Sequence, residues 1–143
     1  ADAYRPYHQA IEDQLGLLLD RHGCALLLDC HSMPPSRARP IVFGDRFGRS
    51  AAPWLTAAAL ELAEKCGFSA ACNDPFAGGH ILDRHGRPDK GIHALQIEVD
   101  RRLYLNRTGE PSPGFDSVAA LIQILTQSLG KILLDRRPAA AAE

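Results

Sequence analysis

The sequence predicts an α/β fold. Short apolar runs, typical of strands that are covered on both faces, alternate along the chain with segments of helical spacing. Glycine and proline residues separate these segments, as expected for turns. With 143 residues, of which 45% are hydrophobic and 23% charged, the chain has the size and composition of a globular domain.

Two strands are predicted to follow an N-terminal helix. Residues 6–22 place apolar side chains at helical spacing, and Gly23 ends the helix. Residues 25–28 form a continuous apolar run, which predicts a buried strand leading into Asp29. After a proline-flanked loop, residues 41–43 predict a second, short strand.

The rest of the chain is predicted to hold two helices and two strands. Residues 53–65 are rich in Ala, Leu and Glu, which favour a helix. A short strand at 68–72 precedes a long loop, and ordered loops beyond about 12–15 residues are usually functional. Residues 93–100 alternate with the period of a strand, and residues 115–134 carry an apolar stripe at helical spacing.

We expect a single domain over residues 1–143, with residues 137–143 as a frayed tail. The 16 Lys and Arg residues nearly balance the 17 Asp and Glu residues, so the net charge is −1. This charge does not indicate the basic surface that binds nucleic acid. No apolar run approaches the roughly 20 residues of a membrane helix, so no membrane partner is expected. The sequence leaves the oligomeric state open.

The four cysteines are spread along the chain without a C-x-x-C pair, which argues against a thiolate zinc site. We favour small buried thiols over disulfides, as expected in the reducing cytoplasm. The residues are Cys24, Cys30, Cys66 and Cys72.

Polar side chains lie where the first predicted strand ends. Asp29, His31 and Ser32 follow the apolar run, and ligands of α/β sheets gather outside the carboxyl ends of strands. Because Asp29 and His31 are two positions apart, both should project to the same side of an extended chain. His31 is either a metal ligand, oriented by a nearby acid or carbonyl, or a capped histidine at a strand end.

Glu98 is the second unusual residue, because it stands in the middle of an otherwise apolar strand. Burial of a carboxylate is costly unless the group is paired or neutral. Glu98 is therefore either a general base with a tuned pKa or a residue on a solvated face of its strand.

Several other polar residues are candidates for binding. Arg101 and Arg102 follow the Glu98 strand, and one of them could bind a substrate carboxylate through two hydrogen bonds, although exposed arginines usually do not. Four further histidines lack the spacing of a helical metal site, and we favour solvated histidines over metal ligands for them. These are His8, His80, His85 and His93.

Taken together, the segments resemble the N-formylglutamate amidohydrolase family. The matching segments occur in the order and at the separations of that family. They are Tyr4-Arg5-Pro6-Tyr7-His8, Asp29-Cys30-His31-Ser32-Met33-Pro34, Gly44-Asp45-Arg46-Phe47-Gly48, Asn73-Asp74-Pro75-Phe76-Ala77-Gly78-Gly79, Gly86-Arg87-Pro88, and His93-Ala94-Leu95-Gln96-Ile97-Glu98 leading to Leu103-Tyr104.

The resemblance implies a three-layer fold of the zinc carboxypeptidase type, with a mixed, largely parallel sheet flanked by helices. It implies that His31 is a zinc ligand and that Glu98 is the catalytic glutamate. Asp29 and Ser32 would then lie next to the zinc ligand and support it without binding the metal. The substrate-binding residues implied by the matching segments are Asn73, Gly78, Gly79, His80, Arg101 and His8.

The activity implied is zinc-dependent hydrolysis of an N-acyl amino acid, most simply N-formyl-L-glutamate, at the end of a histidine-degradation route. A related zinc carboxypeptidase, an N-acyl amino acid deacylase and a non-catalytic binding domain on the same scaffold remain alternatives. Members of the family are about twice as long, so we expect residues 1–143 to form the C-terminal part of an amidohydrolase domain. The first histidine ligand, an acidic ligand and an arginine motif would then precede Ala1.

Overall fold

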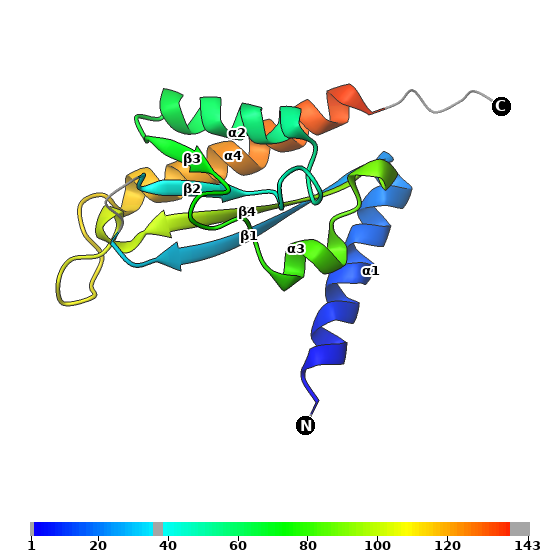
Figure 1. The fold of residues 1–143 in the computed structure, drawn as a ribbon, viewed down its shortest axis with the longest axis horizontal. Coiled ribbons are helices and arrows are strands. Elements are labelled where there is room, and N and C mark those ends of the chain that lie inside the picture. The colour runs from blue at the N-terminus through cyan, green and yellow to red at the C-terminus, as the bar shows by residue number, and fades with distance from the viewer. Residues whose placement is uncertain (1, 36–38, 138–143) are drawn as a thin grey trace.

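A computed structural model describes residues 2–35 and 39–137 of the chain. Helices and strands alternate along most of this length, as expected for an α/β fold (Figure 1). The elements are α1 (Tyr4–His22), β1 (Ala25–Met33), β2 (Ile41–Gly44), α2 (Pro53–Lys65), β3 (Ala70–Cys72), α3 (His80–His85), β4 (Ile92–Asp100) and α4 (Phe115–Arg136), with short 3₁₀ turns at Pro88–Lys90 and Arg101–Leu103.

The four strands of the described residues form one mixed sheet in the order β1-β4-β2-β3. β1 runs parallel to β4, and β2 runs parallel to β3, whereas β2 and β4 are antiparallel. Two of the three strand pairs are thus parallel, which confirms the predicted mixed, largely parallel sheet. β1 lies at one edge of the sheet.

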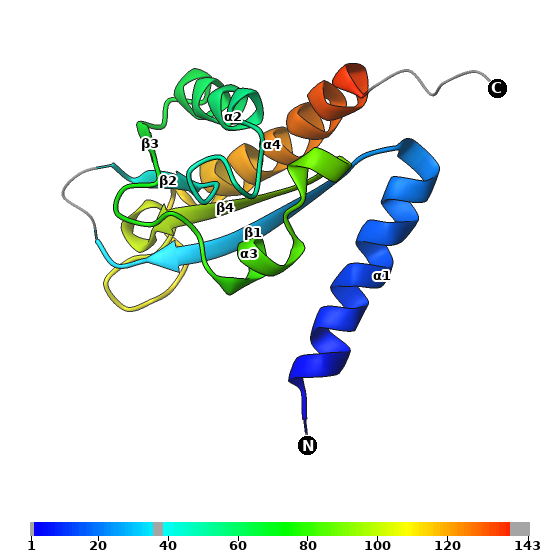
Figure 2. The ribbon, with the colours of Figure 1, turned by 45° about the vertical axis from the view of Figure 1, so that its right-hand side comes forward.

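Helices cover both faces of this sheet, which confirms the three-layer fold. α2 and α4 lie on one face, and α1 and α3 lie on the other (Figures 1 and 2). The main hydrophobic core fills the space between the sheet and the α2–α4 layer. Its fully buried members include Phe43, Leu55, Leu95, Ile97, Leu121, Leu125 and Leu129.

α4 is the longest helix, with 22 residues, and is long and apolar enough by composition alone to cross a membrane. Its apolar stripe is buried in the core, however, at Val118, Leu121, Leu125 and Leu129. This spacing of three and four residues is that of a helix packed on a sheet.

The observed elements differ from the predictions mainly at their ends. β1 extends from Ala25 to Met33 rather than ending near Leu28, because it pairs with β4 in register along its whole length. The loop after β3 contains the short helix α3, which was not predicted because glycines lie at both of its ends. The predicted frayed tail lies outside the described residues from position 138 onward.

All four cysteines are free thiols, as predicted, but they are not all buried. Cys24 is buried, whereas Cys30 is exposed because it lies near the carboxyl end of the edge strand β1. Burial, which disfavours the thiolate, raises the pKa of Cys72 to about 11.

Candidate active site

Four polar residues form a compact group on two neighbouring strands. Asp29 and His31 lie on β1, and Gln96 and Glu98 lie on β4. In the parallel register Asp29 is opposite Gln96, and His31 is opposite Glu98. Because alternate residues of a strand share one face, all four side chains project from the face opposite the α2–α4 core. We call these four residues the polar quartet.

Three short contacts connect the polar quartet. His31 Nε2 lies 3.0 Å from Asp29 Oδ2, and His31 Nδ1 lies 3.9 Å from Glu98 Oε1. Gln96 Nε2 donates a hydrogen bond of 3.0 Å to the same Glu98 oxygen. The side chain of His31 on β1 is 47% exposed, whereas Gln96 and Glu98 on β4 are buried. Solvent therefore reaches the polar quartet from the β1 side.

The contact with Asp29 assigns the two ring nitrogens of His31 to different roles. A carboxylate only accepts hydrogen bonds, so the Asp29 carboxylate at 3.0 Å favours a proton on Nε2 over one on Nδ1. The other ring nitrogen, Nδ1, faces Glu98. This arrangement orients the imidazole in the way that an acid orients a metal-binding histidine.

Glu98 is buried, with only 7% of its surface exposed, so the alternative of a solvated strand face is wrong. Burial raises the pKa of the Glu98 carboxyl above its ordinary value, and the negative charge of Asp29 adds to this rise. The neighbouring His31 opposes it. A carboxylate that is buried but hydrogen-bonded is suited to exchanging a proton with a substrate.

A zinc ion in a catalytic site takes three protein ligands. Within residues 2–35 and 39–137, no group of three His, Cys, Asp or Glu side chains is placed to hold a metal ion. His31 has the geometry of one ligand, but the described residues do not fit a zinc ion by themselves.

Comparison with known proteins identifies the family of this chain. A family model described as N-formylglutamate amidohydrolase matches residues 1–105, which include the whole polar quartet. The chain belongs to the N-formylglutamate amidohydrolase family.

Two curated relatives support this membership. N-formylglutamate deformylases of Pseudomonas putida and Pseudomonas aeruginosa are 32% and 31% identical over 139 and 142 residues of alignment. The alignments cover 92% and 93% of this chain but only 52% and 53% of the relatives. The chain thus spans about half the length of the curated relatives it matches.

A solved structure has the same fold. The crystal structure of N-formylglutamate amidohydrolase from Ralstonia eutropha JMP134 superimposes with a TM-score of 0.76 and 32% sequence identity. The match covers 91% of this chain and 50% of that one. The arrangement of helices and strands is therefore that of one half of an N-formylglutamate amidohydrolase.

Two residues predicted to lie near the site, Ser32 and Arg101, are not members of the polar quartet. Ser32 alternates with His31 on β1, so it projects to the opposite face and lines a pocket of about 410 Å³ that also includes Tyr104 and Phe115. Arg101 follows β4, and its Nε donates a hydrogen bond of 3.4 Å to the carbonyl oxygen of Met33. Arg101 is exposed and lies at the carboxyl ends of β1 and β4, the end that carries His31 and Glu98.

Asn73 is held in a structural network. Its amide nitrogen donates to Asp45 Oδ1 at 2.8 Å, and its amide oxygen accepts from the Asp45 backbone N–H at 3.0 Å. Thr56 donates to the other oxygen of the buried Asp45 carboxylate at 2.6 Å. These hydrogen bonds join the ends of β2 and β3 to α2.

The glycine pair has a similar structural setting. Gly78 has a φ of +99°, which favours glycine, and its carbonyl accepts from Arg46 Nη1 at 3.0 Å. The Gly79 carbonyl accepts the backbone N–H groups of Leu82 and Asp83 at the start of α3. The pair shapes the entry into α3, beside the sheet face that carries the polar quartet.

Three of the remaining histidine candidates lie on α1 and α3, and the fourth, His93, lies on β4. His8 is buried and shares a hydrogen bond of 2.8 Å with buried His85, and exposed His80 shares one of 2.8 Å with Tyr4. His93 is also buried and accepts the Ala52 backbone N–H at 3.1 Å. The prediction of solvated histidines is thus wrong for His8, His85 and His93, whose burial depends on helix packing that the sequence does not display.

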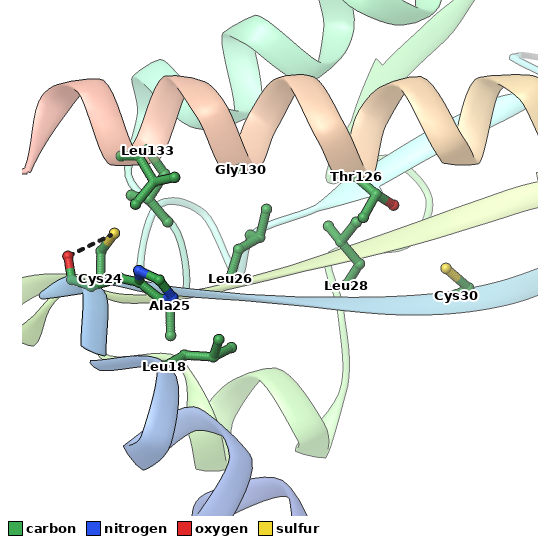
Figure 3. Close-up of a pocket in the computed structure, with 11 residues that line it drawn as sticks. Leu18, Cys24, Ala25, Leu26, Leu28, Cys30, Thr126, Gly130 and Leu133 are labelled. Atoms are coloured by element: carbon green, nitrogen blue, oxygen red, sulfur yellow. Dashed lines mark hydrogen bonds between the residues drawn. The ribbon is translucent and has the colours of Figure 1, made fainter. Parts of the chain in front are cut away.

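An apolar groove of about 570 Å³ lies on the other side of β1 (Figure 3). Leu26 and Leu28 of β1 face it, together with Leu18 of α1 and Leu133 of α4. Because these β1 residues alternate with Asp29 and His31, the groove is separate from the polar quartet.

Gln96 is the member of the polar quartet that the sequence did not single out. A signal for it exists, because Gln96 is polar, lies two residues before Glu98 and shares its face in a strand of period two. The strand is buried from His93 to Asp100, and a buried amide needs hydrogen-bond partners.

Proposed function

We propose that this chain carries the catalytic glutamate of an amidohydrolase that cleaves N-formyl-L-glutamate into formate and L-glutamate. The observation that carries the proposal is the pairing of buried Glu98 with His31 across two neighbouring strands. The names of the Pseudomonas relatives support this substrate. The activity is proposed for the whole protein, since the chain spans about half the length of those relatives.

Glu98 acts in this proposal as a general base and then as a general acid. Its carboxylate takes a proton from the attacking water while the water oxygen bonds to the formyl carbon. It then delivers that proton to the amide nitrogen as the carbon–nitrogen bond breaks. Burial raises the Glu98 pKa, which makes this carboxylate a stronger base than an exposed one.

His31 is proposed as one ligand of the zinc ion that the family resemblance implies. Asp29 lies 3.0 Å from Nε2, so Nδ1 is the nitrogen that would bind the metal. The described residues do not supply three ligands, so the proposal takes the other ligands from elsewhere in the whole protein.

Arg101 is proposed to bind a carboxylate of the substrate. It is exposed, and it follows directly on the strand end that carries Glu98. A guanidinium can form two parallel hydrogen bonds with a carboxylate, which fixes both position and orientation.

The proposal is tested with Glu98→Gln in the protein that carries this chain. Glutamine keeps the shape of the side chain but cannot take a proton, so formate release from N-formyl-L-glutamate should fall by about 100-fold or more. Glu64→Gln, on an exposed position of α2, is the matched control and should keep full activity.

Full activity of Glu98→Gln would remove Glu98 from the mechanism. The unsubstituted protein is also assayed with N-acetyl-L-aspartate and with dipeptides. Faster hydrolysis of either than of N-formyl-L-glutamate would replace the proposed substrate by that of a deacylase or a carboxypeptidase.

A further inference from the structure

We propose that Gln96 is a positioning residue that fixes the orientation of the Glu98 carboxylate. This inference rests on the proposed function, in which Glu98 exchanges protons with water and substrate. It assigns to Gln96 the task of holding one carboxylate oxygen in place so that the other is presented for reaction.

The contact between the two side chains is direct and buried. Gln96 Nε2 lies 3.0 Å from Glu98 Oε1, and the two residues are only 5% and 7% exposed. A carboxylate has no proton to donate, so the amide must turn its NH₂ group toward Glu98. A hydrogen bond to an ionised group in such surroundings is stronger than one between neutral groups.

The hydrogen bond selects one oxygen of Glu98. Oε1 accepts from Gln96 and is also the oxygen that lies 3.9 Å from His31 Nδ1. Among the described residues, no donor holds Oε2 in a hydrogen bond. Gln96 therefore fixes Oε1 beside His31 and leaves Oε2 as the oxygen that can accept a proton.

The neighbours of Gln96 limit where its amide can point. In the sheet, Gln96 lies between Asp29 of β1 and Gly44 of β2. Gly44 has no side chain, and the backbone of Ala77 and Gly78 packs against it. A Cβ at residue 44 would lie only 2.6 Å from these backbone atoms. With cross-strand neighbours on both sides, the amide is directed along the strand toward Glu98.

The first test is kinetic and uses Gln96→Met in the protein that carries this chain. Methionine matches the length and volume of glutamine but donates no hydrogen bond. We expect kcat for N-formyl-L-glutamate to fall about 10- to 100-fold, with KM changed less than about twofold, because Glu98 is misoriented while the substrate still binds.

Gln9→Met is the matched control. Gln9 also donates to a carboxylate, Asp13 Oδ1 at 2.8 Å, but it lies on the exposed side of α1. This variant should keep kcat and KM within about twofold. An unchanged kcat in Gln96→Met would overturn the positioning role, and so would a loss of kcat matched by an equal rise in KM.

The second test needs no activity, so it separates this inference from the proposed function. In an NMR spectrum of the 143-residue chain, the side-chain NH₂ protons of Gln96 should exchange with water more slowly than those of Gln9. Glu98→Ala should abolish this protection. Equal exchange at Gln96 and Gln9 would refute the hydrogen bond even if the protein hydrolyses N-formyl-L-glutamate. Protection without any hydrolysis would leave the contact in place and refute the function.

Discussion

At the residue scale, the alternation of side chains along β1 decides which groups can act together. Asp29 and His31 project to the face that carries Gln96 and Glu98, whereas Ser32 projects to the other. A shift of one residue in the β1–β4 register would place His31 away from Glu98. The proposed chemistry therefore depends on strand pairing as much as on the identity of the residues.

Asn73 gives a prediction at this scale. Asn73→Ala removes two hydrogen bonds between residue 73 and Asp45, and alanine adopts the φ of +59° found there less readily than asparagine does. We expect the free energy of unfolding in urea to fall by about 2–3 kcal/mol, because the buried Asp45 carboxylate loses a donor.

Asn73→Gly separates the two causes, since glycine tolerates the positive φ but also lacks the amide. It should recover only the part of the loss that comes from the backbone. If Asn73→Ala instead left stability unchanged and raised KM, Asn73 would bind substrate rather than join β2 to β3.

At the scale of elements, the contact between α1 and α3 is built from ring nitrogens and charges rather than from apolar side chains alone. His8 Nδ1 and His85 Nε2 share a buried hydrogen bond of 2.8 Å. Arg84 on α3 donates to Glu12 on α1 at 2.9 Å. A hydrogen bond between two imidazoles requires one neutral ring to accept, so this contact depends on protonation.

This contact predicts a dependence of stability on pH. Burial lowers the pKa of both His8 and His85 below the ordinary value of 6.5. The nearby Arg84 and His80 lower both values further, while Glu12 opposes them. As the pH falls below about 6.5, the unfolded chain binds protons that the folded chain resists, so the folded state should lose stability.

The measurement is the thermal unfolding midpoint of the chain between pH 7.5 and pH 5. A His8→Asn, His85→Gln double variant keeps amide groups near the positions of the bonded nitrogens but cannot titrate, so its midpoint should depend less on pH. His22→Gln, at an exposed position, is the control and should keep the full dependence. Identical pH profiles for the double variant and the unsubstituted chain would contradict the assignment.

At the scale of the whole molecule, the chain spans about half the length of its curated relatives, and its proposed site lies on one face of the sheet. The α2–α4 layer closes one face of the sheet, whereas the polar quartet opens to solvent at the edge strand β1. His31 is half exposed there, which leaves room for other groups beside its ring. Metal binding is therefore a property that we expect of the whole protein.

The corresponding prediction concerns zinc content. The protein that carries this chain should bind one zinc ion, and His31→Ala should lower the bound zinc measured after dialysis by at least about tenfold. His22→Ala should leave it unchanged, because His22 lies on the exposed end of α1, apart from the polar quartet. Retention of stoichiometric zinc by His31→Ala would exclude this histidine as a ligand.

The sequence by itself determined the α/β class and the pairing of Asp29 with His31, since both follow from local periodicity. It also marked Glu98, because an acid within an apolar strand is conspicuous in any fold. Only the tertiary structure decided that Glu98 lies opposite His31, because this strand register joins residues more than 60 positions apart. The hydrogen bond from Gln96 to Glu98 joins residues two positions apart, but the burial that gives it its importance comes from the packed sheet. The tertiary structure also decided that His8 and His85 are buried together, since two helices distant in the chain supply one ring each. Local patterns follow from the geometry of a short peptide, whereas these contacts exist only once distant segments pack against one another.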